Sequence, residues 1–483
     1  MRDKNLLILA LINVIALAGS GFGREHGVDL ARRAAELKNL RWGMFVCWSF
    51  STYSGREWSP GITDLSFFRA TEVDTDQWAQ TAKEAGMGYM LFLTKHHDGF
   101  CLWDTKTTDR KVTKAPLGRD VLAELKKSCD KHGVKLALYF SSGDWTWPGA
   151  LDGQSAGTQR QDVVGGNNPE GKKEQLRELL TQYGPIEFIW FDRAAGNGGL
   201  SDEETAVWVK SLQPGCLVGG LGKASNLKTG EGGRPRPADK PYLVTEFTYP
   251  IQPPGQGGAM WFYSLPINEN KCWPAGVLYR DYLRAAEFGN IFSLNVGPNY
   301  EGRLRPIDVA TLQEVGQMIR EKAPMPGNIF GSLSFGKEVT ASSQLTPHHS
   351  PCIVANDDFR RGPTWVAGAK DSKSAWVQID LGEELEVGAA VLRDAGGQTR
   401  QFTIEYRDGD AWRTVVTGTS IQTHHTGKAY LFSPVKARVF RLNIRQSAGP
   451  SSISKFQLYA PGATLPSWVE KVNVSTRLEH RDA

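Results

Sequence analysis

The chain has 483 residues, of which 40% are hydrophobic and 22% charged, enough for one large domain and a second, smaller one. Its 56 basic and 52 acidic side chains leave a formal net charge of +4. Because no block of Lys and Arg stands out, this balance argues against nucleic-acid and acidic-lipid partners.

The N-terminus has the pattern of a secretory signal. Arg2 and Lys4 precede an apolar run from Leu6 to Leu17, and small residues follow. This run is shorter than the roughly 20 residues that a membrane-spanning helix needs. We therefore predict a cleaved signal peptide over residues 1–22 and a secreted or periplasmic mature chain without a membrane span. The six cysteines are too widely spaced to indicate a disulfide framework.

Helical and strand-like segments alternate over the first two thirds of the chain. This rhythm predicts an α/β fold, a TIM-like (β/α)8 barrel over residues 23–333. Its active site is then expected on the loops that follow the carboxyl ends of the strands. The predicted helices cover 29–39, 74–85, 119–132, 172–183, 202–211, 282–288 and 307–321, and the predicted strands 42–49, 89–93, 135–140, 186–191, 216–219, 242–245 and 290–295.

A dense polar cluster follows the apolar strand at 89–93. The stretch from Met90 to Asp104 reads MLFLTKHHDGFCLWD, which places His96, His97 and Asp98 at a predicted rim. A structural loop with an ion pair and one packed histidine is the alternative. Adjacent side chains on extended backbone point to opposite sides, and no further ligand motif accompanies them, so neither a metal nor another cofactor is predicted. Hydrogen bonding to a polyhydroxylated ligand is favoured.

The run TKHHDGFCLWDTKTTD resembles the family 29 glycoside hydrolases, the retaining α-L-fucosidases, and the resemblance extends from about Leu40 to Gly331. It implies a fucose pocket, although for Glu57 a surface salt bridge is the alternative. Two departures from the family are Cys47, where a His is usual, and Arg193, where a Gly is usual. The resemblance implies sugar-binding roles for Glu57, Trp58, His96, His97, Trp103, Tyr139, Trp145 and Trp261.

Asp192 is the predicted nucleophile. It ends the apolar strand at 186–191, where an acidic group is costly unless it is paired or used. A helix N-cap or an ion pair with Arg193 is the alternative. The residue also stands on the family's Trp-[Phe/Ile]-Asp-Gly block, which in the family carries the nucleophile.

A retaining glycosidase needs a second carboxylate, about 5 Å from the first, as acid/base. The candidates are Glu231, Glu246, Glu269 and Glu57, and Glu246 fits best. It closes the strand-like segment 242–245 and resembles the acid/base block Trp-Glu-x-x-x-Thr of many members. The family's Asn-Asp-Arg run is matched here only by Gly219-Gly220-Leu221, so an arginine that normally serves the sugar has no obvious counterpart.

The pattern changes after the linker at 323–327, which contains two prolines and a glycine. Apolar residues then alternate strictly, which predicts an antiparallel β-sandwich over residues 334–462 and a polar tail over 463–483. The segments AWVQIDLG and ISKFQLY resemble the discoidin (coagulation factor 5/8 type C) jelly rolls, to which family 32 carbohydrate-binding modules belong. A sugar-binding module and a structural buttress are both compatible with this resemblance.

Together these patterns predict an exo-acting retaining α-L-fucosidase whose partner is a fucosylated glycan or glycoconjugate. Two alternatives remain open. Cys47, Arg193 and the missing arginine allow a non-catalytic fucose-binding protein. A retaining glycosidase for a related sugar, such as an α-L-galactoside, is the other, because the two sugars differ only by a hydroxyl on C6.

Overall fold

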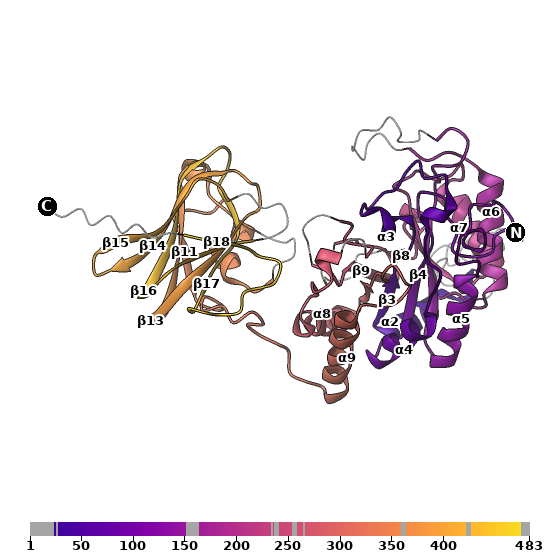
Figure 1. The fold of residues 1–483 in the computed structure, drawn as a ribbon, viewed down its shortest axis with the longest axis horizontal. Helices are drawn as coiled ribbons and strands as arrows, with labels where there is room; N and C mark the ends of the chain where they lie inside the picture. The colour runs from indigo at the N-terminus through magenta and orange to yellow at the C-terminus, as the bar shows by residue number, and fades with distance from the viewer. Residues whose placement is uncertain are drawn as a thin grey trace, which may run out of the picture. The chain divides into compact units, whose positions relative to one another are not determined.

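The computed structural model describes residues 24–25, 28–150, 164–232, 235, 241–253, 258–263, 266–358, 364–421 and 427–474. The chain divides into two compact units, Met1–Met325 and Pro326–Ala483 (Figure 1). The division falls within the predicted linker, a few residues before the predicted domain boundary at 333. The predicted signal peptide, residues 1–22, lies outside the described residues.

The first unit is a closed barrel of eight strands. Neighbouring strands pair in parallel around the whole circle, which closes between β10 and β3. This arrangement confirms the predicted barrel, and it brings the carboxyl ends of all its strands to one rim. The strands are β3 (Trp42–Val46), β4 (Tyr89–Lys95), β5 (Lys135–Ser141), β6 (Phe188–Asp192), β7 (Leu217–Gly219), β8 (Leu227–Lys228), β9 (Val244–Pro250) and β10 (Ile291–Asn295).

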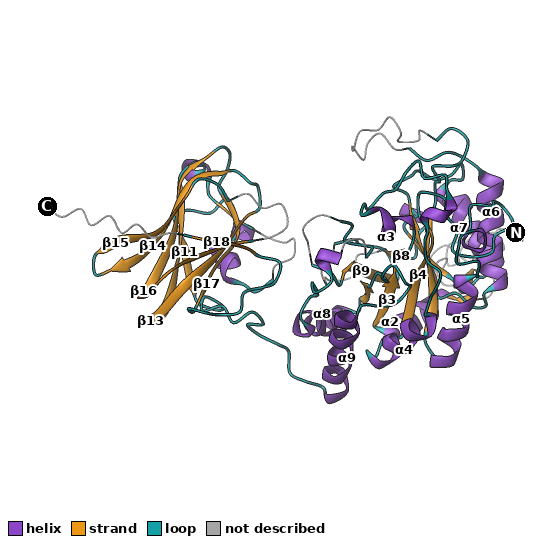
Figure 2. Ribbon diagram, viewed as in Figure 1, coloured by secondary structure: helices purple, strands orange, loops and turns teal. Residues whose placement is uncertain are grey.

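Helices flank these strands (Figure 2). Asp74, Asp120 and Asn168 begin three of them by accepting a hydrogen bond from a backbone N–H of the first turn. Within the described residues, a single 3-10 turn, Gly222–Ala224, follows β7 in place of an α-helix, and no helix is long and apolar enough to cross a bilayer. The helices are α2 (Leu30–Leu40), α3 (Phe50–Ser54), α4 (Thr75–Glu84), α5 (Val121–His132), α6 (Pro169–Gln182), α7 (Asp202–Leu212), α8 (Ala275–Phe288) and α9 (Pro306–Glu321).

One strand differs from its prediction in a way that affects the site. The segment expected to end at Thr245 continues as β9 to Pro250, because Phe247, Thr248 and Tyr249 are good strand formers. Glu246 therefore pairs with Ile291, the first residue of β10, whereas Pro250 pairs with the last. Glu246 thus lies well before the rim instead of at it.

The second unit is an eight-stranded sheet in which all pairs are antiparallel except that of β16 with β18. This confirms the predicted antiparallel β-domain. β13 and β16 are long and carry register shifts, which bend strands, and alternate residues such as Val377, Ile379 and Leu381 form its core. The strands are β11 (Glu338–Ala341), β12 (Trp365–Val366), β13 (Ala375–Asp394), β14 (Thr399–Asp408), β15 (Ala411–Gly418), β16 (Lys428–Ser447), β17 (Ser452–Tyr459) and β18 (Glu470–Asn473).

The first part of the predicted polar tail, residues 463–483, belongs to this sheet. Leu465, Trp468 and Val469 are buried, and β18 pairs with β16. The prediction of a polar tail is therefore wrong for this part, because three apolar side chains pack onto the domain although most of the residues in 463–483 are polar or charged. Residues 475–483 lie outside the described part of the chain.

Candidate active site

A hollow of about 260 Å³ opens among side chains at the rim of the barrel. Its walls come from strand ends and loops that are far apart in the sequence. Most of the predicted site residues contribute to it, but Glu246, Trp103 and Trp145 do not. The lining residues are Phe45, Cys47, Glu57, Trp58, Leu93, His96, His97, Tyr139, Asp192, Glu231, Trp261 and Phe262.

The two histidines follow β4 directly, and their ring centroids are 4.3 Å apart. His96 packs edge-on against Phe262 at 5.4 Å. Burial, followed by the neighbouring His97, lowers the pKa of His96 well below its usual range, so His96 is neutral at physiological pH. Among the described residues its Nδ1 has no hydrogen-bond partner. A neutral imidazole with an unpaired nitrogen, in the wall of a hollow, suits a ligand rich in hydroxyl groups.

Asp192 is the last residue of β6, and three groups surround its carboxylate. Oδ2 accepts a hydrogen bond from the Tyr139 hydroxyl at 2.8 Å, and Oδ1 accepts one from the backbone N–H of Ala194 at 2.7 Å. Nε2 of His97 lies 3.5 Å from Oδ2. Burial raises the pKa of Tyr139 well above its usual value, and the adjacent carboxylate adds to the shift, so the phenol remains a donor. Arg193, the alternative partner of Asp192, pairs with Asp202 at 2.5 Å.

Glu57 and Glu231 are the other two carboxyl groups in the lining. Oε1 of Glu57 accepts hydrogen bonds from the backbone N–H groups of Met260 and Trp261. These bonds connect the loop after α3 to the segment that carries Trp261, another lining residue. Burial raises the pKa of Glu57 to about 7. Glu231 follows β8 and bridges to Thr248 of β9, which places it beside the same hollow.

Glu246 lies inside the barrel and is only 1% exposed. Its Oε2 accepts hydrogen bonds from Nε1 of Trp190 at 3.4 Å and from the backbone N–H of Gly230 at 3.3 Å. Burial raises its pKa to about 7. Glu246 is enclosed and is not in the lining of the hollow, a position that suits a structural carboxyl group better than an acid/base. Glu269, another candidate, lies beside Tyr263 and is not in the lining either.

Two residues predicted to contact the sugar, Trp103 and Trp145, are not in the lining of the hollow. Trp103 is fully buried, and its Nε1 donates to Oε2 of Glu178 at 2.9 Å. Trp145 packs against Trp58 and His97, with ring centroids 5.3 and 5.4 Å away. Trp145 therefore packs on the lining residues Trp58 and His97. The hydrogen bond of Trp103 anchors α6, the helix that contains Glu178.

Some lining residues escaped the sequence-based prediction. Phe45, Leu93 and Phe262 are apolar, and nothing in their type distinguishes them from core residues. The family resemblance marks Cys47 only as a departure from the usual His, yet strand alternation places it on the same side as Phe45, and burial raises the pKa of its thiol. Among the described residues no group of three or more His, Cys, Asp or Glu side chains is arranged to hold a metal ion.

Comparison with known proteins gives the same two-part division. The family model described as alpha-L-fucosidase matches residues 63–323, and that described as F5/8 type C domain matches residues 338–457. The "Alpha-L-fucosidase 1" of Arabidopsis thaliana is 24% identical over 474 residues, which cover 87% of this chain and 86% of the relative. The "Putative alpha-L-fucosidase 1" of Oryza sativa subsp. japonica is 25% identical over 445 residues, covering 86% and 82%.

Solved structures share the fold. A putative alpha-L-fucosidase from Bacteroides thetaiotaomicron superposes with a TM-score of 0.51 at 21% identity, covering 91% of this chain and 98% of the other. An alpha-L-fucosidase from Lactobacillus casei, solved in complex with its α-L-fucose product, has a TM-score of 0.50 at 23% identity and covers 60% and 98%. The family model spans more than half of the chain, and the chain therefore belongs to the alpha-L-fucosidase family of glycoside hydrolases, with an F5/8 type C domain after the barrel.

Proposed function

We propose that this protein is an exo-acting, retaining α-L-fucosidase that releases terminal α-L-fucose from fucosylated glycans or glycoconjugates. The observation that carries the proposal is the set of three carboxyl groups, two histidines and two tryptophans that line one hollow. Its volume of about 260 Å³ is below the roughly 300–1,000 Å³ of pockets for drug-sized ligands. A hollow of this size suits one sugar residue and therefore supports action at a chain end.

In the proposed mechanism Asp192 is the nucleophile. Its carboxylate attacks the anomeric carbon, and the bond to the leaving oxygen breaks as that oxygen receives a proton, which forms a covalent glycosyl-enzyme. The hydrogen bonds from Tyr139 and Ala194 support this role because they hold the carboxylate in one orientation before attack.

We assign the acid/base role to Glu231 in place of Glu246. Glu231 lines the hollow, whereas Glu246 is enclosed in the barrel. As acid, Glu231 gives its proton to the departing oxygen; as base, it takes a proton from the water that attacks the anomeric carbon and releases Asp192. Glu57 is the second candidate. One of its oxygens already accepts hydrogen bonds from two backbone N–H groups, which favours a role in positioning the segment that carries Trp261.

The histidines and aromatic residues would bind the sugar. His96 and His97 would exchange hydrogen bonds with its hydroxyl groups, and Trp58 and Trp261 would cover its apolar face and C6 methyl group. On the basis of the N-terminal sequence alone we also propose that the protein is exported.

The test is turnover of an aryl α-L-fucoside by the purified protein, with the first-formed sugar observed by ¹H NMR. We expect the α-anomer of fucose to appear first, before mutarotation. Release of the β-anomer would contradict the retaining mechanism, and absence of turnover would contradict the enzymatic function. The matching aryl α-L-galactoside, run in parallel, tests the related-sugar alternative, because a better rate on it would change the assigned substrate.

A further inference from the structure

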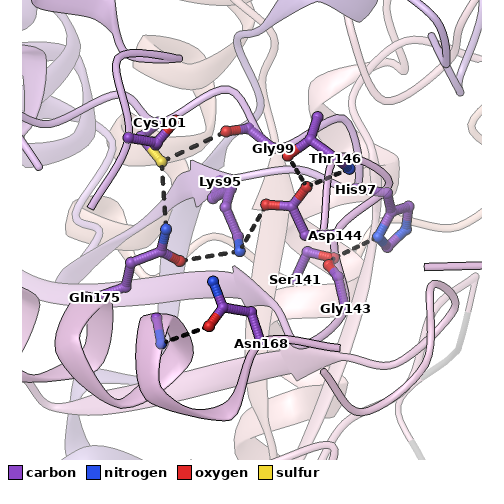
Figure 3. Close-up of polar contacts among 12 residues, drawn as sticks. Lys95, His97, Gly99, Cys101, Ser141, Gly143, Asp144, Thr146, Asn168 and Gln175 are labelled. Carbon is purple, nitrogen blue, oxygen red and sulfur yellow. Dashed lines mark hydrogen bonds and ion pairs between the residues drawn. The ribbon is translucent and has the colours of Figure 1, made fainter. Parts of the chain in front are cut away.

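A buried ion pair lies behind the two histidines. Nζ of Lys95, at the end of β4, is 3.3 Å from Oδ2 of Asp144 and 3.0 Å from Oε1 of Gln175, and both charged side chains are at most 2% exposed. The indole ring of Trp147 lies 3.9 Å from the same ammonium group. Figure 3 shows Lys95 between Gln175 and Asp144. Burying a charge costs solvation free energy, which the ion pair and the additional hydrogen bonds must offset.

The ion pair fixes the loop after β5 against the loop after β4. Oδ1 of Asp144 accepts hydrogen bonds from the backbone N–H and the hydroxyl of Thr146, at 2.7 and 2.6 Å. Trp145, which directly follows Asp144, donates its backbone N–H to the carbonyl of His97 at 2.9 Å. Gly99 has φ +77°, and a Cβ there would lie 2.5 Å from Oδ1 of Asp144. The glycine in the His-His-Asp-Gly run therefore makes room for this carboxylate.

Ser141 connects this framework to the His97 ring. Its Oγ is 2.7 Å from the carbonyl oxygen of Gly143 and 2.5 Å from Nδ1 of His97, and Figure 3 shows the ring turned toward this hydroxyl. A hydroxyl has one proton and a carbonyl has none, so Ser141 uses its only proton in the hydrogen bond that it donates to the carbonyl of Gly143. The contact with His97 then requires a proton on Nδ1.

We propose that Ser141, held by the Lys95–Asp144 ion pair behind it, is a positioning residue that keeps a proton on Nδ1 of His97. This inference rests on the proposed function, because it states what that proton arrangement does for fucoside hydrolysis. With Nδ1 held as a donor to Ser141, the ring is fixed in one orientation, and its other nitrogen, Nε2, lies 3.5 Å from Oδ2 of Asp192. The fixed ring therefore holds Nε2 beside the nucleophile, where it orients the sugar for attack.

The experiment reads the ring nitrogens of His97 directly. Protein labelled with ¹⁵N-histidine contains nine histidines, and the His97 signals are identified by their loss in His97→Gln. We expect wild-type His97 to show a proton on Nδ1. An Nδ1 without a proton would overturn the proposal. This readout needs no turnover, so it stands or falls separately from the proposed function.

Two variants test how the arrangement is maintained. Ser141→Ala should lower the fraction of His97 that carries a proton on Nδ1, and should lower kcat/KM about tenfold, the equivalent of one hydrogen bond. The double variant Lys95→Met/Asp144→Asn removes both charges together and should produce the same spectral change. A folded Ser141→Ala with the wild-type tautomer and kcat/KM would refute the role of the serine. If neither variant folds, the wild-type spectrum still decides the tautomer.

The matched control is Glu187→Gln. Glu187 pairs with Arg33 at 2.7 Å and precedes β6, at the end of that strand opposite to Asp192. Breaking this ion pair should lower stability without moving the His97 signals or kcat/KM. A change of the His97 tautomer in Glu187→Gln would mean that any loss of stability disturbs the ring, and would remove the special role assigned to Ser141.

Discussion

Replacing Glu246 by Gln separates a buried structural carboxyl group from a catalytic one. In the native protein Oε2 of Glu246 accepts hydrogen bonds from Trp190 and from the backbone of Gly230. The amide oxygen of Gln has the same shape and accepts the same bonds. The substitution therefore preserves the contacts and removes the ability to ionise.

The expected effect is on the pH dependence of stability. Burial raises the pKa of Glu246 from 4.5 to about 7, so the native state binds this proton more tightly than the unfolded chain. The resulting stabilisation is fully present below about pH 4.5 and is lost as the pH rises through about 7. At ~1.4 kcal/mol for each pH unit between the two values, the loss amounts to about 3 kcal/mol. Glu246→Gln has no such loss and should be more stable than wild type above pH 7.

The assay is urea unfolding followed by tryptophan fluorescence at pH 5 and pH 8, with kcat on an aryl α-L-fucoside measured in parallel. We expect the stability of Glu246→Gln relative to wild type to increase by about 2–3 kcal/mol between these pH values, and kcat to stay within a few-fold. An equal pH dependence in both proteins would refute the buried, protonated state. A loss of kcat of about 1,000-fold, recovered by azide on an activated substrate, would return the acid/base role to Glu246.

Three further outcomes are expected. Glu57→Ala should raise KM about tenfold because the backbone N–H groups of Met260 and Trp261 lose their acceptor. Glu57→Gln, which keeps an acceptor oxygen, should keep KM near wild type. Equal KM values in the two variants would contradict the role of Glu57 in holding this segment. Trp103→Phe should lower the free energy of unfolding by about 1–3 kcal/mol, since Glu178 loses a buried donor, with KM unchanged; a raised KM would place this ring in contact with substrate. Of the six free cysteines, Cys352 is exposed, Cys272 is partly buried and four are buried, so Ellman's reagent should label Cys352 promptly, and rapid labelling of more than two thiols per native chain would contradict the burial of the other four.

The barrel could be predicted because each of its helix–strand units carries local signals. Asp74 and Asp120 cap helices that begin close to their predicted starts, and Gly133 ends α5 in a left-handed conformation. The apolar strands then deliver Asp192 and the two histidines to one rim. These residues were predictable because a polar group directly after an apolar strand has few structural uses.

The acid/base position could not be predicted in the same way. Glu246 follows an apolar segment much as Asp192 does, but the strand does not stop there, and its register with β10 is a non-local property. Glu231 follows the two-residue strand β8, which is too short to produce a periodic signal. Trp103 and Trp145 show a related limit, because a tryptophan near a site can face the ligand or the layer behind it. Sequence gives the residue type, and only packing decides its direction.

The most direct test of the central claim is to trap the glycosyl-enzyme. Wild-type protein is incubated with an α-L-fucosyl fluoride that carries fluorine at C2, which slows hydrolysis of the covalent intermediate, and the labelled peptide is identified by mass spectrometry. We expect a single fluorofucosyl ester on Asp192, formed in Glu231→Ala as well because the fluoride leaving group needs no proton. A label on Glu231, Glu57 or Glu246, or complete turnover of the reagent to inverted product without any ester, would contradict it.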